Sequence, residues 1–184
     1  MSYVDDAYTQ KSNLGYIRSS MNEPMLERDH EFDLATRWKN NGDEKALHEL
    51  VRSYTRLVIA SAAKFKHYGL PMGDLIQEGN LGLMQAANRF EPERDVRFST
   101  YAAWWIRASI QDYILRNWSI VRTGTTAAHK SLFFNLRRLR ARIDGAETEH
   151  GLTSEGREKI AQALGVRIKD VEDMEGRMHR GDQS

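Results

Sequence analysis

Four aromatic residues fall within eight positions of the chain, and arginines flank them on both sides. They are Phe98, Tyr101, Trp104 and Trp105, with Arg94, Arg97 and Arg107 as the neighbouring arginines. Aromatic rings can stack on unpaired bases while cationic groups meet the phosphates, so this combination is typical of single-stranded nucleic-acid binding. Stacking contributes about 1 to 3 kcal/mol per base, which can offset the few kcal/mol lost on unpairing. We therefore expect a surface that holds opened strands without ATP.

An alternative interpretation is that these aromatic residues fill a small helical core. Tyr101, Trp104 and Trp105 would share one face of a helix through three- and four-residue spacings. A second apolar stripe on the same helix can serve the core instead, and it consists of Ile106, Ile110, Tyr113 and Ile114. We expect at least one of the four aromatic residues to be buried and the others to remain partly free.

Basic residues are concentrated between positions 94 and 142. This segment holds ten of them and two acidic residues, a net charge of +8 in a chain whose total is +1. A basic segment attracts a polyanion by counterion release, and the acidic remainder suits a second, basic partner. On charge alone, a solvated basic helix face explains the segment equally well.

Several classes of chemistry are excluded or disfavoured by composition. The 184 residues include no cysteine, which removes disulfides, thiolate metal sites and thiol nucleophiles. The six histidines lack the spacing of a metal site, and no glycine-rich phosphate loop is present. We expect no cofactor, no metal and no enzymatic activity. The sequence has neither a targeting signal nor an apolar run of the roughly 18 residues that a membrane span needs, so we expect a cytoplasmic protein.

The apolar spacing predicts helices throughout and no strand, an all-α fold. The expected helices lie at about 24–41, 44–68, 75–90, 100–118, 130–143, 155–164 and from 169 onward. We expect caps at Asp43, Asp74, Ser99 and Thr153, and glycine turns at Gly42 and Gly165. The predicted organisation is a mobile arm (1–22), a first domain (23–118), an extended connector (119–128), a second domain (129–178) and a tail (179–184).

Two long motifs, in this order, resemble the sigma-70 family of bacterial transcription initiation factors. Residues 74–84, Asp-Leu-Ile-Gln-Glu-Gly-Asn-Leu-Gly-Leu-Met, resemble the family's principal polymerase-binding helix. Residues 94–107, Arg-Asp-Val-Arg-Phe-Ser-Thr-Tyr-Ala-Ala-Trp-Trp-Ile-Arg, resemble its promoter-melting segment. The resemblance extends from about Glu23 to the C-terminus. It implies a helical sigma domain 2 followed by a small three-helix sigma domain 3.

The first motif implies a surface that grips the coiled-coil of the largest subunit of core RNA polymerase. Its residues would be Asp74, Leu75, Gln77, Glu78, Asn80 and Met84. From their spacing, Gln77, Asn80 and Met84 lie close to one helical face, while Gly79 and Gly82 permit close backbone approach. The glycines fit either a partner surface or a tight helix crossing inside the domain.

The second motif implies contacts with promoter DNA, chiefly with the non-template strand of the minus-ten element. These would be made by Arg94, Arg97, Phe98, Ser99, Thr100, Tyr101, Trp104 and Trp105. The resemblance also implies that Arg107, Gln111 and Arg122 match or neighbour positions that contact the upstream duplex. Val96 stands where housekeeping relatives have an aromatic residue, and Ala108 where they have Gln. We therefore expect a promoter preference different from theirs.

A third motif is similar to the heat-shock type of sigma factor. Residues 129–137, His-Lys-Ser-Leu-Phe-Phe-Asn-Leu-Arg, depart from the box of that type at the first three positions. This resemblance implies a role at heat-shock or stress genes, with chaperones and a regulatory protease as further partners. Such factors carry an additional domain that reads the minus-thirty-five element, and we expect a truncated form or natural fragment because nothing after Ser184 provides it.

The C-terminal part offers a competing function, a stand-alone helix-turn-helix regulator that reads base edges. Residues 160–174 have the helix, glycine turn and helix spacing of such a unit. However, Asp170, Glu172, Asp173 and Glu175 make the second helix acidic, which disfavours insertion into a major groove. We expect this region to serve structural packing.

Overall fold

A computed structural model describes residues 7–117, 126–143 and 152–181, which form helices and no strand. The all-α prediction is therefore confirmed. The helices are α1 (Ala7–Asn22), α2 (Arg28–Asn41), α3 (Glu44–Ser53), α4 (Thr55–Ala63), the short 3-10 helix η1 (Lys66–Tyr68), α5 (Met72–Arg89), α6 (Phe98–Asn117), α7 (Ala127–Ile143), α8 (Ser154–Leu164) and α9 (Ile168–Gly181).

The chain divides into two compact units, residues 1–114 and 115–184. Most of the expected connector, residues 119–125, lies outside the described residues. Its last two residues already belong to α7, so the prediction of extended backbone was wrong there.

The turn between α2 and α3 follows the sequence prediction. Gly42 ends α2 in the left-handed region, with φ of 63°, and its N–H donates to the carbonyl of Trp38. The carboxylate of Asp43 then accepts from the backbone N–H groups of Lys45 and Ala46 at 3.0 and 3.2 Å. These contacts satisfy backbone donors that the start of a helix leaves unpaired.

The single long helix expected over about 44–68 is instead two helices, α3 and α4, followed by the short helix η1. The chain leaves helical geometry at Tyr54, where φ is −110° and ψ is 6°. The Thr55 hydroxyl donates to the carbonyl of Arg52 at 2.8 Å, which supports the break. Buried apolar side chains continue on both sides of it, so the core stripe runs on although the helix does not.

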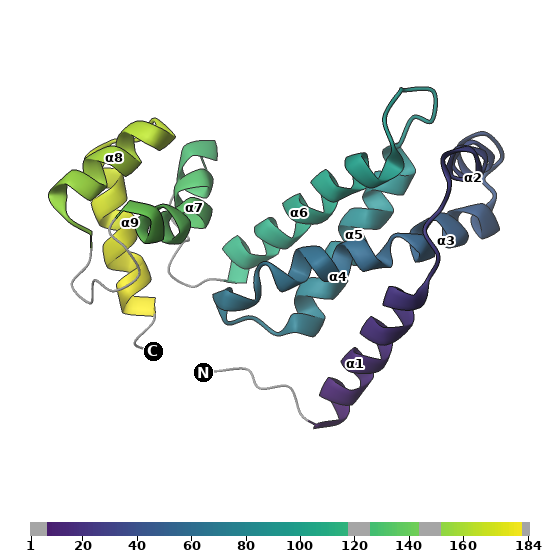
Figure 1. Cartoon of the computed structure of the whole chain (residues 1–184), viewed down its shortest axis with the longest axis horizontal. Coiled ribbons are helices and arrows are strands. Elements are labelled where there is room, and N and C mark those ends of the chain that lie inside the picture. Colours follow the sequence, from purple (N-terminus) through teal and green to yellow (C-terminus); the bar gives the residue numbers. More distant parts are fainter. Residues whose placement is uncertain (1–6, 118–125, 144–151, 182–184) are drawn as a thin grey trace. The chain divides into compact units, whose positions relative to one another are not determined.

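The glycines of α5 serve helix crossings inside the first unit, where α4, α5 and α6 run close together (Figure 1). A β-carbon on Gly79 would lie 2.6 Å from Val58 Cγ1 of α4 and 3.2 Å from Ile110 Cδ1 of α6. One on Gly82 would lie 2.6 Å from the carbonyl oxygen of Trp105. Of the two interpretations of these glycines, the structure supports the tight crossing.

One helix was not predicted, and two predicted helix starts lie elsewhere in the structure. The polar segment expected as an arm forms α1, which packs on α4. Helix α5 begins at Met72 after Pro71, so Asp74 lies in its first turn and is not its cap. Helix α6 begins at Phe98, one residue before the expected cap Ser99.

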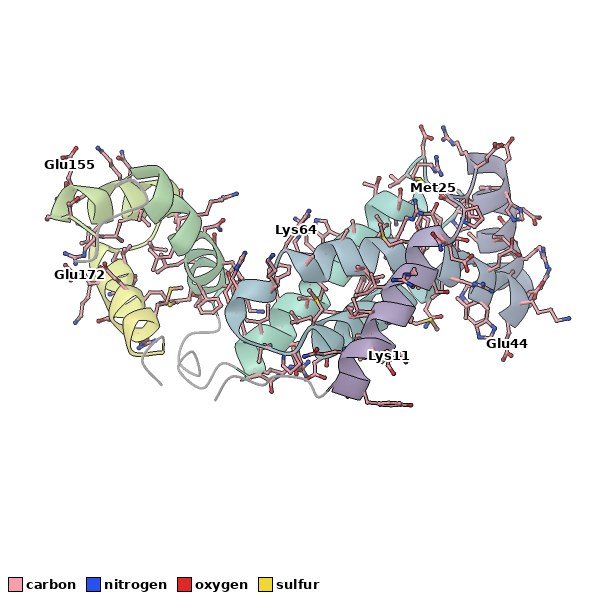
Figure 2. The ribbon with its side chains drawn as sticks, turned by 60° about the horizontal axis from the view of Figure 1, so that its bottom comes forward. Lys11, Met25, Glu44, Lys64, Glu155 and Glu172 are labelled. Carbon is pink, nitrogen blue, oxygen red and sulfur yellow. The ribbon has the colours of Figure 1, made fainter. Side chains whose placement is uncertain are left out.

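The second unit packs α7, α8 and α9 against one another. The Thr153 hydroxyl accepts from the Gly156 N–H at 3.0 Å, and Gly165 ends α8 with φ of 64°, as predicted. The core of the second unit includes Leu132, Phe133, Leu136, Ile160, Val171 and Met174. Glu155 and Glu172 project from the surface of α8 and α9 (Figure 2).

Two kinds of feature are absent from the described residues. Among the described helices, none combines the length and apolar character of a membrane-crossing segment. Within the same residues, no group of three or more histidine or acidic side chains is arranged to hold a metal ion.

Candidate functional site

The aromatic segment begins with a ring that belongs to the core. Phe98 is 0% exposed and packs edge-on against Tyr54 and Phe90, with ring centroids 5.3 and 5.2 Å away. Its side chain therefore supports α6 from inside, which corrects its assignment as a stacking ring. The expectation that at least one of the four aromatic residues is buried is confirmed.

The next rings form a partly covered row. Tyr101 lies 5.6 Å from Phe90 and 6.3 Å from Trp105, measured between ring centroids. The Arg89 guanidinium lies 5.0 Å from the centroid of the Trp105 ring, a cation–π contact that fixes this ring from the end of α5. Sequence reasoning missed Arg89 and Phe90, although a basic and an aromatic residue at the end of a helix before a proline were visible.

Trp104 is the ring that the fold leaves open. It is 75% exposed, while Ile106, Ile110 and Ile114 on the same helix are fully buried. The predicted isoleucine stripe is thus confirmed as core; Tyr113 is half-exposed and donates to Asp74 at 3.0 Å. We call Tyr101, Trp104 and Trp105 the aromatic surface. Its rings can stack on flat, π-rich ligands.

The cations around the aromatic surface differ in how they are held. Arg94 is exposed and pairs with Glu91 three residues before it. Arg107 is exposed and has no ion-pair partner in the described part of the chain. Arg97 is bound to Glu31 of α2. Arg122 lies outside the described residues.

Three further predicted DNA contacts lie along α6. Thr100 is exposed, while Ser99 and Gln111 are half-buried. They therefore reach the surface on both sides of the aromatic segment, and Thr100 is the most accessible of the three.

Glu31 is a buried carboxylate that connects α2 to the start of α6. Only 3% exposed, it accepts from Arg97 Nε and Nη2 at 3.1 Å each, from the Phe98 N–H at 2.8 Å, and from the Tyr54 hydroxyl. Burial by itself raises the pKa of Glu31, but these hydrogen bonds and the Arg97 charge outweigh burial and hold that pKa below its ordinary value. Burial and the bond to Glu31 raise the pKa of Tyr54.

A groove of about 440 Å³ lies between α2 and the segment that precedes α6. Phe32, Phe90 and Val96 give it apolar walls, and Arg28 and Asp95 pair at its edge. Phe32 and Val96 are both exposed large apolar residues. The groove adds room for a flat or apolar group next to Arg97.

A second surface lies on α5. Asp74 and Gln77 are exposed, and Glu78, Asn80 and Met84 are half-buried. Leu75 is 0% exposed, so its side chain belongs to the core and cannot face a partner, which corrects its assignment.

Sequence reasoning missed Leu81, although its spacing could have revealed it. Leu81 is 57% exposed, lies four residues after Gln77 and precedes Met84 by three, and such spacings place residues side by side on a helix. We call Asp74, Gln77, Asn80, Leu81 and Met84 the α5 face. A single exposed leucine is ordinary on a protein surface, but next to the half-buried Met84 it gives the α5 face an apolar centre with polar surroundings, as protein interfaces have.

Helix α1 reaches the α5 face. The Asn80 side-chain nitrogen donates to the Tyr16 hydroxyl at 3.1 Å. A β-carbon on Gly73, in the first turn of α5, would lie 3.1 Å from the side chain of Asn13. The segment expected as a free arm therefore contacts a predicted site residue.

Comparisons with known proteins cover the part of the sequence that holds both surfaces. A family model described as Sigma-70 region 2 matches residues 50–120, which contain both the α5 face and the aromatic surface. The RNA polymerase sigma factor RpoH of Caulobacter vibrioides is 50% identical over 169 residues, covering 92% of this chain and 57% of that protein. RpoH of Rhizobium radiobacter is 48% identical, with 92% and 56% covered.

A relative with a different name matches almost the whole chain. The RNA polymerase sigma-C factor of Myxococcus xanthus is 40% identical over 184 residues, covering 98% of this chain and 61% of that protein. The chain thus spans a little over half the length of these relatives.

Proposed function

The chain belongs to the sigma-70 family of RNA polymerase sigma factors, and on this premise we propose that it is a bacterial transcription initiation factor of the heat-shock type. It binds core RNA polymerase and recognises and opens the minus-ten element of promoters. The observation that carries this proposal is the exposed Trp104 beside Tyr101 and Trp105, on a helix with a free Arg107. The chain makes and breaks no covalent bond in this role.

The α5 face is the proposed contact with the coiled-coil of the largest polymerase subunit. Gln77, Asn80 and Asp74 offer polar groups that can bond to a partner helix, and Leu81 and Met84 offer apolar area among them. Such a mixture of an apolar centre and polar surroundings resembles the anatomy of a protein interface.

The aromatic surface is the proposed contact with the opened non-template strand. Trp104 presents a free ring for base stacking, and Trp105 is already fixed by Arg89. A base that leaves the duplex exchanges its stacking partners for these rings, at about 1 to 3 kcal/mol per base. Arg107 can meet a phosphate of the same strand.

A binding titration tests the first part. Fluorescently labelled chain is titrated with core RNA polymerase, next to the variant Gln77→Ala. We expect saturable binding that the substitution weakens. A folded chain that does not bind core polymerase would refute the proposal.

Promoter opening tests the second part, with permanganate reactivity of unpaired thymines as the readout. Trp105→Ala should leave polymerase binding intact and reduce reactivity in the minus-ten element, because it removes a ring of the aromatic surface. Reactivity equal to that of the unsubstituted chain would contradict the assignment.

We further propose that the chain acts in the cytoplasm at heat-shock or stress promoters. The similarity to RpoH proteins supports this role, as does the motif at 129–137, in which Leu132, Phe133 and Leu136 are buried. Transcription from templates that differ only in a heat-shock or housekeeping minus-ten element would measure the preference. The resemblance also leads us to propose control by chaperones and a regulatory protease, which the lifetime of the chain in chaperone-depleted cells would test.

A further inference from the structure

We propose that Glu31 and Arg97 act as one positioning pair, which fixes the start of α6, and that Arg97 does not itself neutralise a DNA phosphate. This inference rests on the proposed function. It changes the role of one expected DNA contact and adds Glu31, a residue far from both sequence motifs.

The first support is that Glu31 and a backbone carbonyl occupy the Nε–Nη2 edge of the Arg97 guanidinium, although the side chain is 40% exposed. Its Nε and Nη2 donate to the two oxygens of Glu31, and Nη2 also donates to the carbonyl of Leu26 at 3.1 Å. A bidentate arrangement of this kind holds the planar guanidinium in one orientation. A phosphate would have to compete with a carboxylate that already occupies this edge.

The second support is the burial of Glu31. A buried carboxylate that loses its cation is strongly destabilised, because it cannot recover the solvation that it gave up on folding. Arg97 therefore stays with Glu31 when DNA approaches. The pair carries no net charge, so it attracts a polyanion far less than Arg107 does, which is exposed and forms no ion pair with any described residue.

The third support is the bond from Glu31 to the backbone of α6. The carboxylate accepts from the N–H of Phe98, the first residue of the helix, at 2.8 Å. A negative charge at a helix start is stabilised by the helix dipole and fixes where the first turn lies. Tyr101, Trp104 and Trp105 follow within the next two turns, so Glu31 sets the place from which the aromatic surface projects.

The experiment measures binding of a single-stranded minus-ten oligonucleotide to the assembled holoenzyme at several salt concentrations. The variants are Arg97→Gln, Arg97→Lys and, as the matched control, Arg107→Gln. Loss of one phosphate contact lowers the slope of log affinity against log salt by about 0.7 for a single strand. We expect this reduction for Arg107→Gln.

For Arg97 we expect a different result. Arg97→Gln should weaken binding about tenfold at every salt concentration, equivalent to one impaired stacking contact, and leave the slope unchanged. Arg97→Lys should not restore affinity, because lysine keeps the charge but cannot reproduce the bidentate bond. A reduced slope for Arg97→Gln, or rescue by lysine, would overturn the inference.

A double variant provides an independent check. Because the two residues form one unit, the double variant carrying Glu31→Gln and Arg97→Gln should bind the oligonucleotide no more weakly than the weaker of the two single variants. Additive losses would overturn the pairing. Failure of the unsubstituted holoenzyme to bind the oligonucleotide would instead refute the proposed function itself, so the two failures are distinguishable. Retained polymerase binding, which depends on α5, confirms that each variant is folded.

Discussion

The carbonyl oxygen of Trp105 lies 2.6 Å from the position that a β-carbon on Gly82 would occupy. At this point the backbone of α6 lies close to Gly82 of α5, which has no side chain to keep the two helices apart. Ser109 Oγ and Ile106 Cα, at 2.8 and 3.0 Å, close the remaining space. The helix that carries the proposed polymerase contact therefore touches the helix that carries the proposed DNA contact.

This relationship predicts the effect of Gly82→Ala. The added methyl group must displace the α6 backbone, which costs about 1 to 3 kcal/mol of unfolding free energy. Gly79→Ala should cost less, because its nearest neighbour is a side-chain methyl of Val58. Thermal unfolding followed by circular dichroism would measure both. Gly15→Ala is the matched control, since nothing lies within 4 Å of its β-carbon, and it should stabilise α1 slightly.

A second prediction concerns Leu81, which lies on the α5 face. Leu81→Asn should weaken core polymerase binding by about tenfold, roughly 1.4 kcal/mol, because an apolar contact covered by the partner is lost. Fold stability should change little, since the side chain is exposed. Titration with core polymerase measures the first effect and thermal unfolding the second. The control is Asn40→Ala, which changes an exposed side chain on α2. If both variants bound core polymerase with equal affinity, Leu81 would not be part of the interface.

We expect the substitutions Trp104→Ala and Trp105→Ala to differ in their effects on stability and on oligonucleotide binding. Trp104→Ala removes an open ring, so we expect unchanged stability and a loss of about 1 to 3 kcal/mol in oligonucleotide binding. Trp105→Ala also removes the contact with Arg89 and the packing on Tyr101, so it should lower both stability and binding. Fluorescence anisotropy of a labelled minus-ten oligonucleotide, paired with thermal unfolding, distinguishes them. Destabilisation by Trp104→Ala would contradict this division.

Glu31 predicts a pH dependence of stability. Its folded-state pKa lies below the ordinary value of 4.5, so its stabilising contribution is fully present above about pH 4.5 and is lost as pH falls through the lowered pKa. The difference in unfolding free energy between the unsubstituted chain and Glu31→Gln should be largest at neutral pH and shrink on acidification. Urea unfolding across that range measures it. A difference in unfolding free energy for Glu31→Gln that stays constant across that pH range would contradict the prediction.

Local signals in the sequence were sufficient for much of the fold. Gly42, Asp43, Thr153 and Gly165 end or begin helices as predicted, because each acts on backbone within a few residues. The aromatic segment could also be found, since its residue types are unusual for a core. The resemblance of both motifs to the sigma-70 family is confirmed by the comparisons.

Features that depend on distant contacts could not be predicted. Glu31 meets Phe98 across 67 positions of sequence, and neither residue's neighbours indicate that pairing. Helix α1 lacks apolar periodicity and is held by contacts such as the bond from Arg56 to the carbonyl of Glu23 just after it. The break at Tyr54 was invisible because apolar spacing continues through it. Burial of Leu75 and Phe98 likewise depends on which face each helix turns inward.

The bond between Asn80 and Tyr16 has a consequence for how the α5 face would appear in an alanine scan. A partner that binds the Asn80 amide exchanges one hydrogen bond for another, so the net gain is smaller than for a group that was solvated. Replacing Asn80 removes the bond to Tyr16 in the free chain and the bond to the partner in the complex, and these two losses offset each other in the measured affinity. Asn80 can thus lie within an interface and still show no change in affinity when it is replaced by alanine. In an alanine scan of the α5 face, the position that helix α1 contacts would appear unimportant.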